Sequence, residues 1–193
     1  MTWRLTPPTL PASDEGWARA ALPRGDAAAA VGAFRGHSHG ARLPDGALPA
    51  AIRPEGRAPL PPLFALRFGL LVASGAVRAA VEAAAPGRHR FWAVAVRRGA
   101  GQGTEAWHGL IVRAAARALD EGRSACRVEP AEPLLGLARR ATLAGVAGVA
   151  PDRLPAEALW WDHGLSVPYL LCDDALAARL HALGATGLER CRT

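Results

Sequence analysis

Residues 66–85 read LRFGLLVASGAVRAAVEAAA, and this stretch indicates more about the fold than any other. Its first part, residues 66–72, is a short apolar run, which predicts a buried β-strand. Ser74 follows at a position where its hydroxyl can accept a hydrogen bond from a free N–H of a first helical turn. Val77 and Val81 stand three and seven residues beyond Ser74, so both lie on one face of a helix. The stretch therefore predicts a strand followed by a serine-capped helix.

The same plan recurs towards the C-terminal end of the sequence. Residues 166–172, SVPYLLC, predict a second strand, and Asp173 or Asp174 is positioned to cap the helix that follows. Leu176 and Leu180 stand three and seven residues beyond Asp173, which repeats the spacing of the first unit. Two strand–cap–helix units predict an α+β domain with a mixed or antiparallel sheet that at least two helices cover.

Further elements are expected between the two units. The first helix extends over residues 75–85, where a Pro-Gly pair ends it. Residues 91–96 and 107–112 are apolar runs on either side of a glycine-rich stretch, which predicts a hairpin. Residues 133–141 are compatible with a third helix.

The first third of the chain differs in composition from the rest. Residues 1–62 hold ten of the sixteen prolines and keep neither helical nor strand periodicity over any length. Trp3 and Trp17 are anchors that a freely disordered tail rarely carries. We therefore expect an irregular Pro/Gly/Ala-rich segment over residues 1–62, packed on a single α+β domain over residues 63–193.

Composition bounds the class of protein and its compartment. The chain has 193 residues, half of them hydrophobic, which suffices for a core and argues against a collagen-like or membrane-spanning protein. Its three cysteines, Cys126, Cys172 and Cys191, form no Cys-x-x-Cys pair, so we expect reduced thiols in a cytoplasmic protein. The start of the sequence lacks the charged and apolar regions of a secretion signal.

The charge leaves a nucleic-acid-binding role open. All 23 basic residues are arginine, against 17 acidic residues, which gives a net charge of +6. A basic balance is typical of proteins that bind phosphate backbones. The arginines are scattered, however, and the only adjacent pairs are Arg97-Arg98 and Arg139-Arg140. A basic nucleic-acid-binding accessory protein is therefore the alternative hypothesis.

No group of residues indicates a reaction or a cofactor. The glycine-rich residues 99–103 lack the third glycine of a dinucleotide loop and lead into a strand, so a hairpin loop is expected there. His37 and His39 could offer two imidazoles to a metal, but the other histidines have no ligand spacing. Asp162-His163 is not accompanied by the motifs of a hydrolase. We therefore predict that the protein is not an enzyme and has no catalytic, cofactor-binding or metal-binding residues.

Two adjacent pairs are the candidates for contact with a partner. Trp160 and Trp161 lie on a strand predicted over residues 156–161, where neighbouring side chains point to opposite faces. One ring is therefore exposed unless another segment, such as the N-terminal one, covers it. Arg139 and Arg140 form the second pair, and Trp and Arg are both enriched among the residues that dominate protein interfaces. These four residues are our predicted partner-binding residues.

The order of several motifs carries a resemblance to a known family. The apolar strand, serine cap and helix of residues 70–82 come first, and two aromatic-led strands follow. Ala118-Leu119-Asp120 comes next, with Ser124 four residues on. The sequence closes with a strand over residues 167–173, a helix, and the turn GATGL at residues 184–188. In this order the motifs resemble the immunity-protein domain of bacterial polymorphic toxin systems, the family first defined on myxobacterial proteins and formerly a domain of unknown function.

The resemblance covers residues 63–192, with two departures. Glu189 stands where the family usually has an aromatic, and Ala93 replaces the proline of a Pro-Val motif. The resemblance implies a cytoplasmic, non-enzymatic protein-binding module without a cofactor. Such a module would neutralise or regulate a cognate toxin or effector encoded nearby. Interfaces of this kind typically bury about 1,600 Å² and depend on a few aromatic or arginine anchors.

Overall fold

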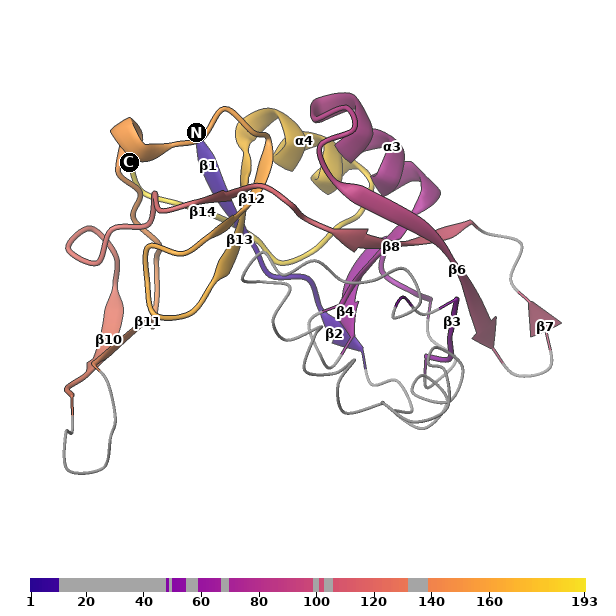
Figure 1. Cartoon of the computed structure of the whole chain (residues 1–193), viewed down its shortest axis with the longest axis horizontal. Helices are drawn as coiled ribbons and strands as arrows, with labels where there is room; N and C mark the ends of the chain where they lie inside the picture. Colours follow the sequence, from indigo (N-terminus) through magenta and orange to yellow (C-terminus); the bar gives the residue numbers. More distant parts are fainter. Residues whose placement is uncertain are drawn as a thin grey trace.

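A computed structural model shows how the chain is folded (Figure 1). It describes residues 1–10, 48, 50–54, 59–66, 70–98, 101–102, 106–131 and 139–193. Within these residues, two α-helices lie side by side against two larger β-sheets, and a third sheet of two strands stands apart. The α+β class with mixed and antiparallel sheets, predicted from the sequence, is confirmed. None of the helices in the described residues is long and apolar enough to cross a bilayer.

The first sheet joins the two ends of the chain, in the order β14–β1–β13–β12–β9. Its strands are β1 (Thr2–Leu5), β9 (Ala115–Ala116), β12 (Leu159–Asp162), β13 (Tyr169–Asp173) and β14 (Leu188–Arg190). Strand β1 runs antiparallel between β13 and β14, whereas β9 is parallel to β12. Isolated bridges join Leu119 to Val149 and Gly148 to Arg192, and thus link the chain after β9 to the chain after β14. The sheet and these bridges therefore form a closed ring of paired segments.

The second sheet has the order β2–β4–β5–β8–β6–β3, and β7 pairs with β6. Its strands are β2 (Thr9–Leu10), β3 (Ala51–Ile52), β4 (Leu63–Leu66), β5 (Leu71–Ser74), β6 (Arg90–Arg98), β7 (Gly101–Gln102) and β8 (Trp107–Ile111). The edge strands β2 and β3 are parallel to their neighbours, and the central strands are antiparallel. Because β6 and β8 pair antiparallel, the hairpin predicted from residues 91–96 and 107–112 is confirmed.

The two predicted caps open the two helices, α3 (Gly75–Ala84) and α4 (Asp174–Ala182). The Ser74 hydroxyl accepts the Val77 N–H at 3.3 Å, and the Asp173 carboxylate accepts the Leu176 N–H at 2.7 Å. The two helices pack against each other. Their buried faces are the predicted ones, with Val77, Val81, Leu176 and Leu180 in one core cluster that also takes residues from both sheets.

The capping bond of α4 can be tested directly. Replacement of Asp173 by alanine is expected to lower the free energy of unfolding by about 1 kcal/mol, because the Leu176 N–H loses its acceptor. Asp173→Asn keeps an oxygen at the cap and should stay near the wild-type value. Urea unfolding of both variants measures the difference, and equal stability of the two variants would contradict the capping role.

Two of the predicted elements differ from the structure. The strand predicted over residues 66–72 is two antiparallel strands, β4 and β5, and the chain reverses direction between them. Both strands are apolar and buried, and Arg67 and Gly69 are the signals of their separation that the sequence reading passed over. The helix predicted over residues 133–141 is wrong at its end, because Arg140–Leu143 is strand β11. The first part of that prediction, over residues 133–138, lies outside the described residues.

The N-terminal segment is not irregular throughout. Thr2–Leu5 forms a strand inside the first sheet, with Thr2 and Leu5 buried. Four residues before a Pro-Pro pair are too few to show strand periodicity, and their partners lie more than 160 residues away along the chain. Residues 11–47 lie outside the described residues, so the boundary at residue 62 stays a prediction.

His89, in the turn after α3, gives the fold a dependence on pH. The residue is 5 % exposed, and its ring Nδ1 accepts the backbone N–H of Arg113 at 3.4 Å. Burial is the largest cause that lowers the pKa of His89 from 6.5 to about 4. Arg88 and Arg113 lower this pKa further, whereas Glu82 and Glu157 raise it. The ring is therefore neutral in the folded protein near pH 7.

Acid is expected to destabilise the protein through His89. The unfolded chain binds a proton at this ring near pH 6.5 but the folded chain only near pH 4, so stability falls as the pH drops through that window. A loss of about 2 to 3 kcal/mol by pH 4 corresponds to the pKa difference. Urea unfolding at pH 7 and pH 4.5 measures it. His89→Asn keeps an acceptor and cannot titrate, so an unchanged pH slope in that variant would refute the assignment.

Candidate functional site

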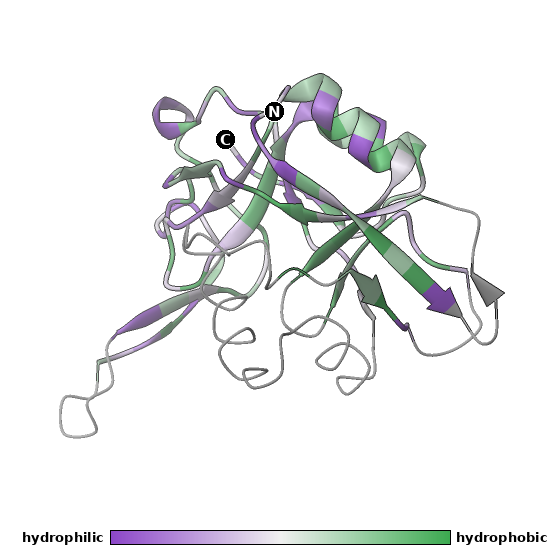
Figure 2. Ribbon diagram, turned by 45° about the vertical axis from the view of Figure 1, so that its right-hand side comes forward, coloured by the Kyte–Doolittle hydropathy of each residue, from purple (hydrophilic) through white to green (hydrophobic). Residues whose placement is uncertain are grey.

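A two-stranded ribbon projects from the body of the protein. It consists of β10 (Cys126–Glu129) and β11 (Arg140–Leu143), which pair antiparallel. In both views the ribbon extends away from the two larger sheets, and hydrophilic residues follow much of β10 (Figures 1 and 2). A projecting ribbon of this kind is accessible to a macromolecular partner from several sides.

The ribbon presents a charged face and a partly apolar face. Arg127 stands opposite Thr142 and Glu129 opposite Arg140, which places these side chains on one face. On the other face Val128 stands opposite Ala141. Ala141 is buried against the body, whereas 44 % of Val128 is exposed. Val128 is thus an exposed apolar side chain on the face opposite the charged residues.

The two predicted arginines lie on this ribbon. Arg139 immediately precedes β11, and its guanidinium forms a two-pronged salt bridge with the carboxylate of Glu121. The hydrogen bond with Arg139 lowers the pKa of Glu121 and raises the pKa of Arg139, so both groups stay charged. Arg140 is exposed and makes no ion pair with any residue that the structure describes. One arginine is therefore held in place and its neighbour is available to a partner.

Hydrogen bonds fix β11 to β13 and to the loop that precedes it. The N–H of Ala141 donates to the Ser166 hydroxyl at 2.7 Å, and the N–H of Ser166 donates to the Ala141 carbonyl at 3.0 Å. Two residues further along, the Leu143 N–H donates to the Tyr169 hydroxyl at 2.8 Å. These bonds occupy the edge of β11 that faces away from β10.

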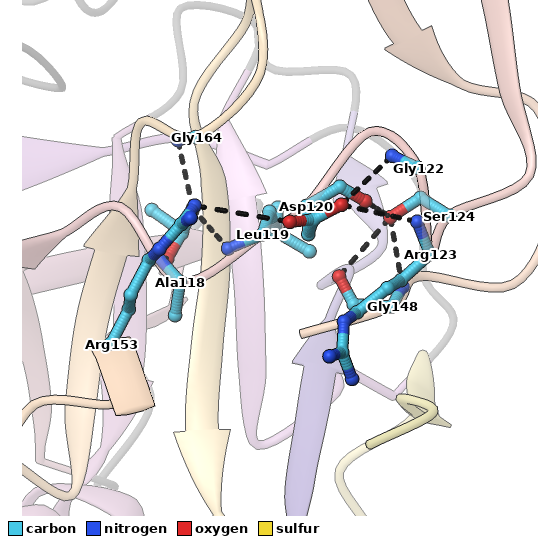
Figure 3. Close-up of polar contacts among 10 residues, drawn as sticks. Ala118, Leu119, Asp120, Gly122, Arg123, Ser124, Gly148, Arg153 and Gly164 are labelled. Atoms are coloured by element: carbon cyan, nitrogen blue, oxygen red, sulfur yellow. Dashed lines mark hydrogen bonds and ion pairs between the residues drawn. The ribbon is translucent and has the colours of Figure 1, made fainter. Parts of the chain in front are cut away.

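The base of β10 begins at a hydrogen-bonded turn (Figure 3). The Asp120 carboxylate accepts the Gly122 N–H at 2.8 Å, which closes a turn over residues 120–124. The Ser124 hydroxyl donates to the Asp120 carbonyl at 2.6 Å and accepts the Gly148 N–H at 2.9 Å. The turn is thereby joined to Gly148, whose bridge to Arg192 helps to close the ring of the first sheet.

Asp162 is the buried polar centre beneath this region. Its carboxylate is 0 % exposed and accepts four N–H groups. Backbone groups of Ala118, Leu119 and Gly164 donate at 2.7, 3.1 and 2.9 Å, and the Trp160 indole donates at 3.3 Å. Asp162 therefore has a structural role: its carboxylate holds together the backbone segments around it.

The two predicted tryptophans point to opposite faces of the first sheet, but neither ring stands free. Trp160 is 2 % exposed and packs inside the ring of paired segments, in a cluster that includes Ala141 at the base of the ribbon. Trp161 is half-buried and packs against the core on the helix side. Each face of this sheet therefore has its own core, a feature that the sequence did not reveal. The residues packed with Trp160 include Ala114, Leu119, Ala147 and Val149.

The remaining chemical candidates form no site within the described residues. No group of three or more metal-ligating side chains is found there, and His37 and His39 lie outside it. Gly101 and Gln102 form the short strand β7 against β6, whereas the other glycines of that loop lie outside the described residues.

The three cysteines are free thiols, and two of them are buried in the core. Cys126 is partly exposed, whereas Cys172 and Cys191 are buried. Burial is the main cause that raises the pKa of Cys172 to about 12 and that of Cys191 to about 11. Both buried thiols are therefore protonated near pH 7 and are poor nucleophiles.

Sequence reasoning missed the ribbon residues Arg127 and Val128. The signal was present, because residues 126–129 alternate between apolar and charged side chains and Pro130 ends the run. A run of four residues is short for this pattern, and its partner strand was assigned to a helix.

Comparison with known proteins assigns the chain to a family. No curated protein matches the sequence. Residues 7–190, nearly the whole chain, match the family described as "Immunity protein family (Imm11)". The match confirms the predicted resemblance and extends it into the N-terminal third, where the motifs gave no sign of it. Members of this family are non-enzymatic inhibitors that neutralise a cognate toxin. The chain belongs to the Imm11 family of immunity proteins.

Proposed function

We propose that this immunity protein acts in the cytoplasm on a toxin encoded by a neighbouring gene, and that the β10–β11 ribbon forms part of the contact surface. Membership of the family establishes binding of a cognate toxin. The observation that supports the surface is the projection of the ribbon, with exposed Val128 and Arg140 beside the ion-paired Arg139. A toxin surface with excess negative charge is the partner that these arginines favour.

The predicted tryptophans take different parts in this proposal. Trp160 acts from the core, because it packs in the same cluster as Ala141 of β11 and so supports the base of the ribbon. Trp161 lies on the other face of the sheet, beside the helices. Its half-buried ring would contact the toxin only if the toxin covered that face as well as the ribbon. The arginines are therefore the first residues to test.

The function is tested by co-expression with the neighbouring toxin gene. Cells that produce the toxin together with this protein are expected to survive, and the two proteins should co-purify. The double variant Arg139→Ala/Arg140→Ala should weaken the complex about tenfold, mainly through slower association, because it removes two charges from the ribbon. Biolayer interferometry with a catalytically inactive form of the toxin measures both rates.

A matched control removes the same charge elsewhere. Arg97→Ala/Arg179→Ala takes two exposed arginines from β6 and α4, away from the ribbon, and should leave the association rate within about twofold of the wild type. Equal effects of the two double variants would reject the ribbon as a contact surface. A mobility shift with DNA or RNA at low salt, combined with no toxin complex, would favour the nucleic-acid alternative instead.

A further inference from the structure

Strand β10 has a partner on only one of its two edges. It belongs to a two-stranded sheet, and β11 is its only strand partner within the described residues. The outer edge of β11 is occupied, because the N–H groups of Ala141 and Leu143 donate to Ser166 and Tyr169. The equivalent edge of β10 has no such cover among the residues that the structure describes. The two edges of the ribbon are therefore unequal.

The register identifies the backbone groups on the open edge. Ala141 and Leu143 direct their N–H groups away from β10, so the residues opposite them, Val128 and Cys126, form non-hydrogen-bonded pairs. In an antiparallel pair, such residues direct their N–H and C=O groups outward. Ala125 confirms the alternation, because its N–H and C=O both bond on the β11 side, to Val146 and Ala144. Cys126 and Val128 thus present two N–H and two C=O groups on the open edge.

The side chains at this edge indicate what a pairing strand would carry. Residues 121–131 and 139–140 contain four arginines and two glutamates, a net charge of +2. On the charged face, 75 % of the Arg127 side chain is exposed, beside Glu129 at 3.7 Å. Val128 lies on the opposite face and is exposed. Because side chains alternate along a strand, a complementary segment would alternate acidic and apolar residues.

We infer that β10 accepts an extended segment of the toxin as a third strand of the ribbon, through the outward N–H and C=O groups of Cys126 and Val128. The inference rests on the proposed function and specifies its binding mode. Main-chain hydrogen bonds to an open edge supply affinity in strand addition, and alternate side chains supply specificity. Acidic residues of the added strand lie over Arg127, and an apolar residue covers Val128. Pro130 has no N–H and limits the added strand to a short segment.

A proline substitution tests the inference because it removes a single outward N–H. Val128→Pro deletes the N–H on the open edge, and proline is tolerated at such a position of an edge strand. Val128→Ala removes the same apolar contact and keeps the N–H, so it is the matched control. With the inactive toxin of the neighbouring gene as probe, Val128→Pro should weaken binding at least thirtyfold, and Val128→Ala less than tenfold. Circular dichroism and urea unfolding check that both variants are folded.

Amide hydrogen exchange on the wild-type complex gives a second readout that needs no variant. The amides of Cys126 and Val128 should exchange rapidly in the free protein and become protected in the complex, whereas those of Arg127 and Glu129 should be protected in both. Wild-type binding by Val128→Pro, or no new protection at Cys126 and Val128, would overturn strand addition while leaving the proposed function intact. A free protein that dimerises and is made monomeric by Val128→Pro would also overturn it, because a second copy would then occupy the edge. No toxin binding by the wild type would instead reject the proposed function.

Discussion

Replacement of Asp162 by alanine is expected to lower the free energy of unfolding by roughly 3 to 5 kcal/mol, a large part of the stability of a domain of this size. The fully buried carboxylate accepts three backbone N–H groups and the Trp160 indole N–H. Alanine leaves these four donors without an acceptor in the core, at a cost that exceeds the loss of the bonds themselves. Urea unfolding followed by tryptophan fluorescence measures the change.

The control for this prediction is Asp152→Ala. Asp152 is an exposed acid in the 3₁₀-helix Pro151–Arg153, so the variant loses the same charge without uncovering buried donors. Its stability should stay within about 0.5 kcal/mol of the wild type. Similar stabilities of the two alanine variants would show that the hydrogen bonds at Asp162 contribute little.

Gly187→Ala should be the second large effect, about 3 kcal/mol or more. Gly187 has a φ of +77°, where a side chain is strained, and a Cβ atom there would lie 1.9 Å from the Thr6 carbonyl oxygen. That oxygen belongs to the backbone beside β1, and the Thr6 N–H itself donates to the Gly187 carbonyl at 2.8 Å. The substitution therefore pushes apart the neighbouring strands β1 and β14, which come from opposite ends of the chain.

A second glycine isolates the steric part of this effect. Gly184 has a φ of +81° and nothing within 4 Å of its Cβ position, so Gly184→Ala carries only the conformational strain, roughly 1 to 2 kcal/mol. Thermal and urea unfolding of the two variants compare them under the same conditions. If both variants lose the same stability, the close approach of Thr6 does not matter and the prediction is wrong.

The sequence predicted best what depends on neighbours along the chain. The caps at Ser74 and Asp173, the buried faces of both helices and the β6–β8 hairpin all follow from spacings of a few residues. Strand β1 was missed because its partners lie at the other end of the chain. Periodicity over four residues cannot show pairing at that distance, since a strand is stabilised by its neighbours in the sheet.

The candidate site was only partly predictable for the same reason. Arg139 and Arg140 were selected as an adjacent pair, and the structure places both on the ribbon. Trp160 was selected because it forms an adjacent Trp pair on a strand and Trp is enriched at interfaces, but the ring of paired segments encloses it. Whether an aromatic ring on a strand is exposed depends on which distant segment crosses that face. Here the covering segment contains many small residues, which carried no periodic signal.

The position of β1 between β13 and β14 has a consequence for synthesis on the ribosome. The chain from β4 to β8 can pair with itself as it emerges, because these strands and α3 are close together in sequence. Strand β1 leaves the ribosome before β13 and β14, and these two partners are complete only when residues 169–190 have been translated. The sheet to which the ribbon is fixed therefore assembles last. On the proposed contact through the ribbon, toxin binding would require the completed chain, so translation of the immunity protein ahead of its toxin would favour the survival of the cell.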